Sequence, residues 1–153
     1  MDLIGTPAPD FELSDHHGVA WRLSALRGQN VMVVFYPYAF TGVCTGELCA
    51  IRDELAPSLP AETQLLAISC DTKFALRVFA EQQGLNIPLL SDFWPHGEVA
   101  SAYGVFDPER GCAIRGTFLI DRDGVVRWSV VNAIPHARDI SDYRRALGEL
   151  VAG

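Results

Sequence analysis

The chain has 153 residues, of which 49% are hydrophobic and 20% charged, and its formal net charge is −7. This composition is typical of a globular protein with a sizeable core, and we expect residues 1–153 to form a single domain. The acidic balance argues against a nucleic-acid partner or an anionic membrane surface. Phosphate groups attract basic patches, and the longest basic cluster is Arg144-Arg145.

The N-terminal stretch MDLIGTPAPDF lacks the basic and apolar regions of a secretory signal, and no apolar run approaches the ~20 residues that span a bilayer. We therefore expect a cytoplasmic protein with no membrane partner. In a reducing cytoplasm, the four cysteines point to packing, metal binding or redox chemistry rather than to structural disulfides.

Strand and helix patterns alternate along the chain. In chain order they predict a hairpin at 11–13 and 19–22, a buried strand at 31–36, a helix at 45–55, a strand at 65–69, a helix capped by Asp71 or Thr72 and stopped by Gly84, a strand at 89–90, a helix at 98–103, a hairpin at 116–120 and 125–130, and a final helix at 141–151. This order predicts an α/β fold, a central mixed β-sheet flanked by helices on both faces, with an N-terminal β-hairpin.

The stretch PYAFTGVCTGELC, residues 37–49, joins the predicted buried strand to the helix that follows it. Thr41 is a candidate N-cap whose side chain would accept a hydrogen bond from a backbone N–H two or three residues on, which places Cys44 in the first helical turn. Unpaired N–H groups and the helix dipole favour an anion there, and the thiolate is the reactive form of cysteine. Pro37, which cannot donate a backbone N–H, would shield the pocket from water. The alternative is that Cys44 is a small buried apolar residue.

Cys49 lies five positions after Cys44. On an intact helix this spacing puts the two Cα atoms roughly 8–9 Å apart, whereas a disulfide needs ~4.4–6.8 Å. The two sulfurs could therefore bond only if the first helical turns unwind. The alternative is that Cys49 is an ordinary helix-surface residue.

The motif PYAFTGVC resembles the P-x-x-x-[TS]-x-x-C signature of the peroxiredoxins, thiol peroxidases with a thioredoxin-like fold. Three further stretches also resemble the family: IGTPAPDFEL, RGTFLIDRDGVVRW, and LLSDFWPHGEVASAYGVF, which is similar to the alkyl hydroperoxide reductase E subgroup. The C-x₄-C spacing of Cys44 and Cys49 instead resembles the Q-type (bacterioferritin-comigratory) members.

The resemblance implies that the Cys44 thiolate attacks a hydroperoxide, and that Thr41 and Arg115 orient the oxygens and stabilise the developing charge. Cys44 becomes a sulfenic acid, which Cys49 resolves as a disulfide, with Cys112 as another candidate. A thiol reductant would be thioredoxin, a glutaredoxin-like mycoredoxin or a low-molecular-weight thiol. The resemblance also implies a homodimer and no metal or organic cofactor, since sulfur carries the two electrons.

Other residues have simpler interpretations. We expect Cys70 to be a core residue, Cys112 to lie on a loop, His16 and His17 to be exposed, and Trp94 and Phe40 to pack in the core. Glu47 would complement the dipole of its helix. A zinc site is not indicated by C-x₄-C with scattered histidines, of which His136 stands alone. The alternative functions are a thioredoxin-fold dithiol–disulfide oxidoreductase, which the missing C-x-x-C disfavours, and a non-catalytic binding module.

Overall fold

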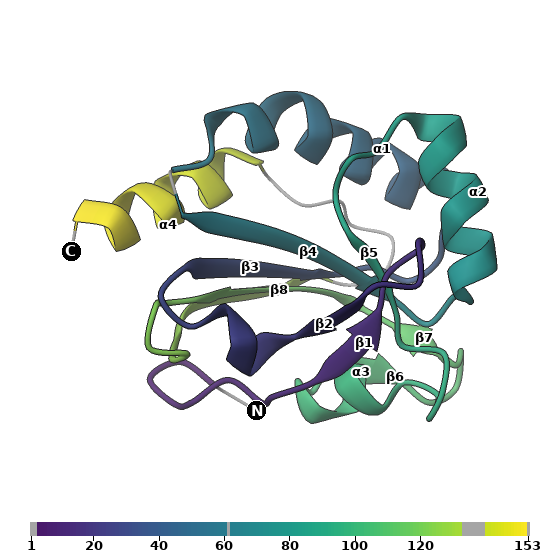
Figure 1. Ribbon diagram of the computed structural model, residues 1–153, viewed down its shortest axis with the longest axis horizontal. Helices are drawn as coiled ribbons and strands as arrows, with labels where there is room; N and C mark the ends of the chain where they lie inside the picture. Colours follow the sequence, from purple (N-terminus) through teal and green to yellow (C-terminus); the bar gives the residue numbers. More distant parts are fainter. Residues whose placement is uncertain (1–2, 61, 133–139, 153) are drawn as a thin grey trace.

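The computed structural model describes residues 3–60, 62–132 and 140–152 (Figure 1). Its centre is a five-stranded sheet in the order β5-β4-β3-β8-β9. The strands are β3 (Asn30–Phe35), β4 (Thr63–Ser69), β5 (Leu89–Ser91), β8 (Arg115–Ile120) and β9 (Val126–Asn132). The first three are mutually parallel, whereas β8 and β9 run antiparallel to their neighbours, so the sheet is mixed as predicted.

The central strand β3 is buried along its whole length. Alternate side chains point to opposite faces, so Met32 and Val34 join one apolar cluster while Val31 and Val33 join another. A strand covered on both faces has little room for polar side chains, which explains the continuous apolar run that follows Asn30 in this strand.

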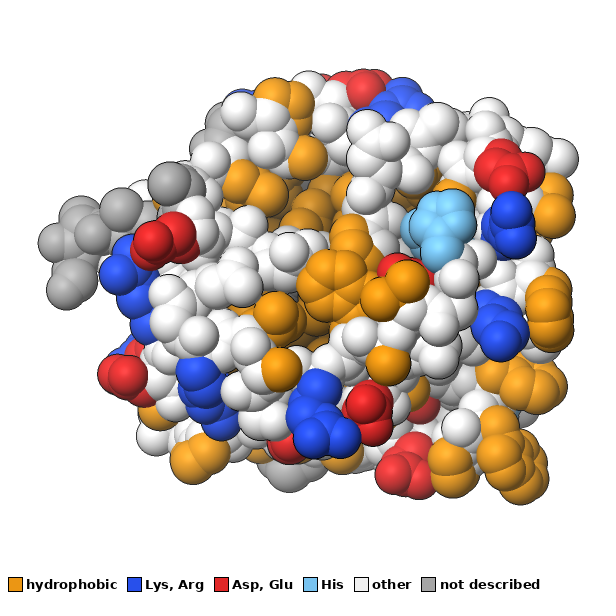
Figure 2. Space-filling model, viewed as in Figure 1, with side chains coloured by type: hydrophobic (Ala, Val, Ile, Leu, Met, Phe, Trp, Pro, Cys, Tyr) orange, Lys and Arg blue, Asp and Glu red, His pale blue; other side chains and the backbone are white. Residues whose placement is uncertain are grey.

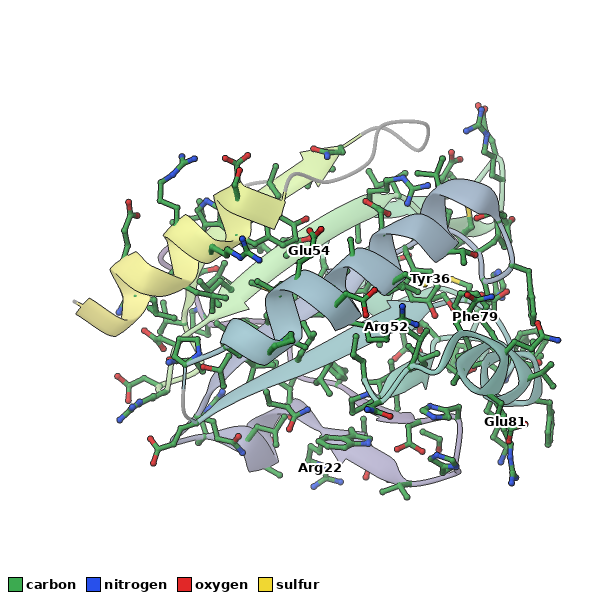
Figure 3. The ribbon with its side chains drawn as sticks, turned by 90° about the horizontal axis from the view of Figure 1, so that it is seen from above. Arg22, Tyr36, Arg52, Glu54, Phe79 and Glu81 are labelled. Atoms are coloured by element: carbon green, nitrogen blue, oxygen red, sulfur yellow. The ribbon has the colours of Figure 1, made fainter. Side chains whose placement is uncertain are left out.

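Helices cover the face that carries Met32 and Val34 (Figure 1). They are α1 (Gly42–Ala50), which continues into a π-helical turn (Ile51–Leu55) and a 3₁₀ turn (Ala56–Ser58), α2 (Lys73–Gln83) and α4 (Ile140–Ala152). Seen from above, the chain around Glu54 lies beside α4 (Figure 3), where Arg144 donates a hydrogen bond of 2.6 Å to the Glu54 carbonyl. The predicted helix at 45–55 thus begins earlier, at Gly42, and its second half is π-helical.

The other face is covered by the N-terminal hairpin and by α3. The hairpin pairs β1 (Glu12–Ser14) with β2 (Ala20–Arg22), and α3 spans Glu98–Ala102. Beyond α3 lies a small antiparallel pair, β6 (Phe106–Asp107) and β7 (Cys112–Ala113), which the sequence patterns did not indicate. Two-residue strands are too short for any periodicity to be read.

The predicted cap and stop of α2 and the predicted turn between β8 and β9 are confirmed. Thr72 caps α2 by accepting a hydrogen bond from the Ala75 N–H at 3.2 Å, and Gly84 ends the helix with a left-handed φ of 62°. The β8–β9 hairpin closes at Gly124, whose φ is 83°. Within the described ranges, no helix combines the length and apolar character needed to cross a bilayer.

Candidate active site

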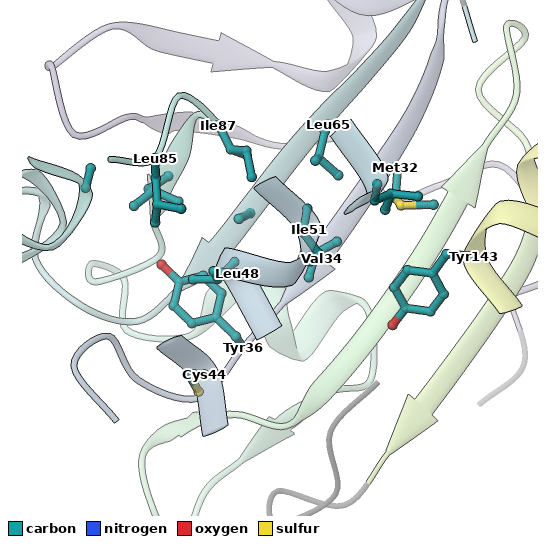
Figure 4. Packing of buried hydrophobic residues seen from close by; sticks show 14 of the residues in the cluster. Met32, Val34, Tyr36, Cys44, Leu48, Ile51, Leu65, Leu85, Ile87 and Tyr143 are labelled. Atoms are coloured by element: carbon teal, nitrogen blue, oxygen red, sulfur yellow. The ribbon is translucent and has the colours of Figure 1, made fainter. Parts of the chain in front are cut away.

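Cys44 lies in the first turn of α1, just beyond the carboxyl end of β3. Its side chain is fully buried, on the apolar stripe that continues through Leu48 and Ile51 (Figure 4). Tyr36, from the segment that follows β3, belongs to the same cluster. The strand-to-helix junction predicted from the motif therefore places the thiol in a dry environment at the sheet edge where chemistry gathers in α/β folds.

Arg115 brings a positive charge to this thiol. It is the first residue of β8 and only 2% exposed, and its Nη1 lies 3.4 Å from the Cys44 Sγ. The antiparallel pairing of β8 with β3 places the start of β8 near the end of β3. A guanidinium this close places a fixed positive charge beside the sulfur in a site with little access to water.

Glu47 holds the guanidinium in place. Its carboxylate is 5% exposed and forms a buried ion pair with the same Arg115 nitrogen that contacts Cys44. The expectation that Glu47 only complements the helix dipole is therefore incomplete. The sequence did carry a signal that Glu47 lies near the thiol. Glu47 is three residues after Cys44, and residues three apart share a helix face.

Thr41 has the N-cap position but does not cap the helix as predicted. Its backbone is extended, and its side chain accepts no hydrogen bond from the first turn. The hydroxyl instead donates to the Tyr38 carbonyl at 3.0 Å. This bond stays within residues 37–41, which we call the active-site loop, and it leaves the hydroxyl oxygen able to accept a further hydrogen bond.

The active-site loop contains one strained residue. Phe40 has a φ of 68°, in the left-handed region that costs a non-glycine residue about 1–2 kcal/mol. Pro37 is buried. The Tyr38 hydroxyl donates a bond of 2.7 Å to the Arg110 carbonyl, which ties the loop to the turn between β6 and β7.

Cys49 is partly exposed and lies one turn further along α1. Its Sγ is 3.7 Å from the Gln83 Oε1 at the end of α2, and all four cysteines are free thiols. The π-helical turn begins two residues after Cys49. Such turns leave the regular hydrogen-bond ladder and are frequent at functional sites.

The other two cysteines, Cys70 and Cys112, are buried. Cys70 follows β4 and is 4% exposed, as expected for a core residue, and burial raises the pKa of its thiol to about 12. Cys112 was expected on a loop but lies in β7 and is fully buried. Burial also raises the pKa of the Cys112 thiol.

The burial of several aromatic and histidine side chains differs from the expectation. Trp94 is 80% exposed and Phe40 is 52% exposed, so neither is a core residue, although the Phe40 ring contacts Phe79. His16 is buried rather than exposed, with its Nδ1 accepting the Leu89 N–H at 3.4 Å. His136 lies outside the described residues. In the described part of the chain, no three His, Cys, Asp or Glu side chains are grouped to hold a metal ion.

Comparison with known proteins identifies the class. Residues 4–129 match the AhpC/TSA family, and the chain belongs to this family, the peroxiredoxins. Alkyl hydroperoxide reductase E of Mycobacterium tuberculosis is 43% identical over 150 residues, covering 97% of this chain and 98% of the relative. A putative peroxiredoxin of Synechocystis is 32% identical and covers 94% of this chain and 76% of that protein.

Solved structures agree in fold. The crystal structure of Enterococcus faecalis AhpC superposes with a TM-score of 0.88 at 26% identity, covering 97% of this chain and 92% of that one. Peroxidoxin BcpB of Mycobacterium tuberculosis gives a TM-score of 0.81 at 34% identity, covering 99% and 98%. The thioredoxin-like fold is thereby confirmed. The protein is a thiol-dependent hydroperoxide reductase, an antioxidant enzyme whose substrate is a hydroperoxide and whose reductant is a thiol. A dithiol oxidoreductase or a non-catalytic module is not favoured.

Proposed function

We propose that Cys44 is the peroxidatic cysteine of this enzyme. One observation carries the assignment: the buried Arg115 guanidinium lies 3.4 Å from the Cys44 Sγ and is held there by Glu47. The Cys44 thiolate attacks the terminal oxygen of the hydroperoxide, the O–O bond breaks, and the leaving oxygen takes a proton to become water or an alcohol. Cys44 is left as a sulfenic acid, so the sulfur has lost the two electrons that the peroxide gains.

Thr41 and Arg115 have separate roles in this proposal. The Thr41 hydroxyl accepts a hydrogen bond from the peroxide while it donates to the Tyr38 carbonyl, which orients the O–O bond toward the sulfur. Arg115 stabilises the thiolate before the attack and the charge on the leaving oxygen during it. Pro37, buried beside the loop, keeps water away from the thiol.

Cys49 is proposed as the resolving thiol. It condenses with the Cys44 sulfenic acid to form a disulfide and releases water. Cys49 is partly exposed, and the π-helical turn that follows it weakens the helix on that side. The first turns of α1 would have to unwind for the two sulfurs to meet. Cys112 is the weaker candidate, because it is fully buried in β7 and its raised pKa disfavours a nucleophilic thiolate.

Mass spectrometry after one equivalent of hydroperoxide tests both assignments. We expect the wild type to show a Cys44–Cys49 disulfide, the Cys49→Ser variant to retain a sulfenic acid at Cys44, and the Cys44→Ser variant to consume no peroxide. The Cys112→Ser variant is the matched control and should behave as the wild type. Peroxide turnover by Cys44→Ser would remove Cys44 from the mechanism, and a stable sulfenic acid in the wild type would remove Cys49.

The proposal extends to the reductant of the enzyme. Thioredoxin, a glutaredoxin-like mycoredoxin or a low-molecular-weight thiol would reduce the Cys44–Cys49 disulfide. We propose that the enzyme acts in the cytoplasm and that residues 1–153 form one domain. Rates of reduction of the oxidised protein by each of the three identify the donor.

A homodimer is proposed from a set of exposed apolar side chains. Figure 2 shows hydrophobic groups along the edge formed by α2 and the segment before α3, where Phe74 and Trp94 are 74% and 80% exposed. Large exposed apolar surfaces are typical of protein contacts. Light scattering should give a dimer for the wild type and a monomer for Phe74→Glu, and a monomeric wild type would refute the proposal.

A further inference from the structure

A carboxylate from a distant strand holds the backbone of the active-site loop. Asp71 follows the carboxyl end of β4, and its Oδ2 accepts a hydrogen bond of 2.9 Å from the Ala39 N–H. Ala39 is 7% exposed, so water has little access to this N–H. A hydrogen bond to a charged acceptor is stronger than a neutral one, and losing it would leave the buried donor without a partner.

Asp71 is itself held from two sides. The Ser69 hydroxyl, at the end of β4, donates to the same Oδ2 at 2.8 Å and also accepts the Asp71 N–H at 3.3 Å. The Ser91 hydroxyl, at the end of β5, donates to the Asp71 backbone carbonyl at 2.6 Å. The position of the carboxylate is therefore determined by the ends of two parallel strands, which form the rigid part of the sheet.

The loop needs such an anchor because its conformation is strained. Phe40, the residue after Ala39, has a φ of 68°. Such backbones persist where the surroundings over-determine them. The next residue, Thr41, is the N-cap of α1, and its carbonyl accepts the Thr45 N–H at 2.9 Å. The Ala39 N–H thus lies two residues before the N-cap of the helix that carries Cys44.

We propose that Asp71 is a positioning residue for the peroxidase reaction, which sets the start of α1 through the Ala39 N–H and so keeps Cys44 in line with Arg115. This inference rests on the proposed role of Cys44. Asp71 acts through the backbone and makes no contact with the substrate. Its hydrogen bond, rather than its charge, is the feature that matters, because a negative charge near a thiolate works against the thiolate.

Stopped-flow oxidation of Cys44 by hydrogen peroxide tests the proposal in three variants. Asp71→Ala removes the acceptor and should lower the second-order rate about 10- to 100-fold, the size of effect expected when a reacting group is misplaced by about 1 Å. Asp71→Asn keeps an acceptor oxygen without the charge and should restore the rate to within about threefold of the wild type. Asp123→Ala is the matched control. It removes an exposed carboxylate in the turn between β8 and β9 and should leave the rate unchanged.

A second measurement decides the question if Asp71→Ala does not fold. Amide hydrogen exchange in the wild type should show the Ala39 N–H strongly protected, and the N–H of the exposed Gly42 much less so. An Ala39 N–H that exchanges as fast as Gly42 overturns the proposal. A rate within twofold of the wild type in a folded Asp71→Ala also overturns it, whereas a wild type whose Cys44 does not react with peroxide overturns the proposed function and this inference together.

Discussion

Cys44 and Cys70 both lie beyond the carboxyl ends of parallel strands, but in opposite chemical environments. Each follows the carboxyl end of a parallel strand, β3 or β4, and each is almost inaccessible, at 0% and 4% exposure. Cys44 meets the Arg115 guanidinium and the start of a helix. Cys70 meets apolar surroundings, Asp92 and Cys112, all of which disfavour its charged form.

The comparison predicts that burial by itself does not make a thiol reactive. Desolvation penalises the charged form of any thiol, and a nearby carboxylate adds to that penalty at Cys70. At Cys44 a cation held by Glu47 opposes the same penalty. We therefore expect the reactivity of each thiol to depend on the charges that neighbouring helices and strands place beside its sulfur.

The largest expected effect is the difference in alkylation between the thiols. A thiol with a pKa of about 12, as at Cys70, is about one part in ten thousand ionised at pH 8, so iodoacetamide should leave it unmodified while Cys44 reacts. Peptide mapping after brief treatment of the native protein measures this. Treatment in urea is the control and should label all four cysteines. Equal labelling of Cys44 and Cys70 in the native state would contradict the comparison.

Removal of the cation should give the next largest effect. Arg115→Ala should slow oxidation of Cys44 by peroxide about 10²- to 10³-fold, the usual cost of one donor in a preorganised site. Arg115→Lys keeps a charge without the planar fork and should recover part of the rate. Stopped-flow fluorescence gives the rates, with the exposed Arg110→Ala as the matched control. If Arg115→Ala reacted at the wild-type rate, the guanidinium would have no catalytic role.

Replacing Glu47 by Gln tests how much the reaction depends on the position of the Arg115 guanidinium, because the positive charge of Arg115 is kept. The bond to Arg115 loses about half its strength when its acceptor becomes neutral, and we expect a five- to tenfold slower reaction with peroxide. The rates are measured by stopped-flow fluorescence, with Glu81→Gln, an exposed glutamate on α2, as control. A Glu47→Gln variant that reacted at the wild-type rate would contradict the positioning role of the ion pair.

The smallest effect concerns His16, far from the thiols. Burial lowers the pKa of its imidazole, so the unfolded state binds the proton more readily and stability falls as the pH drops below about 6.5. The slope should be at most about 1 kcal/mol per pH unit between pH 6.5 and 5. His17 and Asp15 lie beside it, and Arg77 acts on it from α2.

Urea unfolding across this pH range measures the slope. His16→Asn should flatten it, since the amide oxygen can accept the Leu89 N–H without titrating. His96→Asn, at an exposed histidine outside this hairpin, is the matched control and should leave the slope in place. An unchanged slope in His16→Asn would assign the pH dependence to other groups.

The sequence by itself determined the features that depend on neighbouring residues. The apolar run of β3, the Thr72 cap and Gly84 stop of α2, the turn at Gly124 and the place of Cys44 at a helix start all follow from short-range sterics and hydrogen bonding. The capping hydrogen bond predicted for the Thr41 side chain was wrong. An N-cap residue has more than one backbone partner within reach, and here its hydroxyl bonds the Tyr38 carbonyl.

Only the tertiary structure decided which side chains surround the thiol. Arg115 lies 71 residues from Cys44, and Asp71 lies 32 residues from Ala39. Strand pairing brings them together, and no periodicity within either segment encodes it. The same holds for the burial of Cys112 and the exposure of Trp94, because burial depends on which elements pack above a residue and not on its own hydrophobicity.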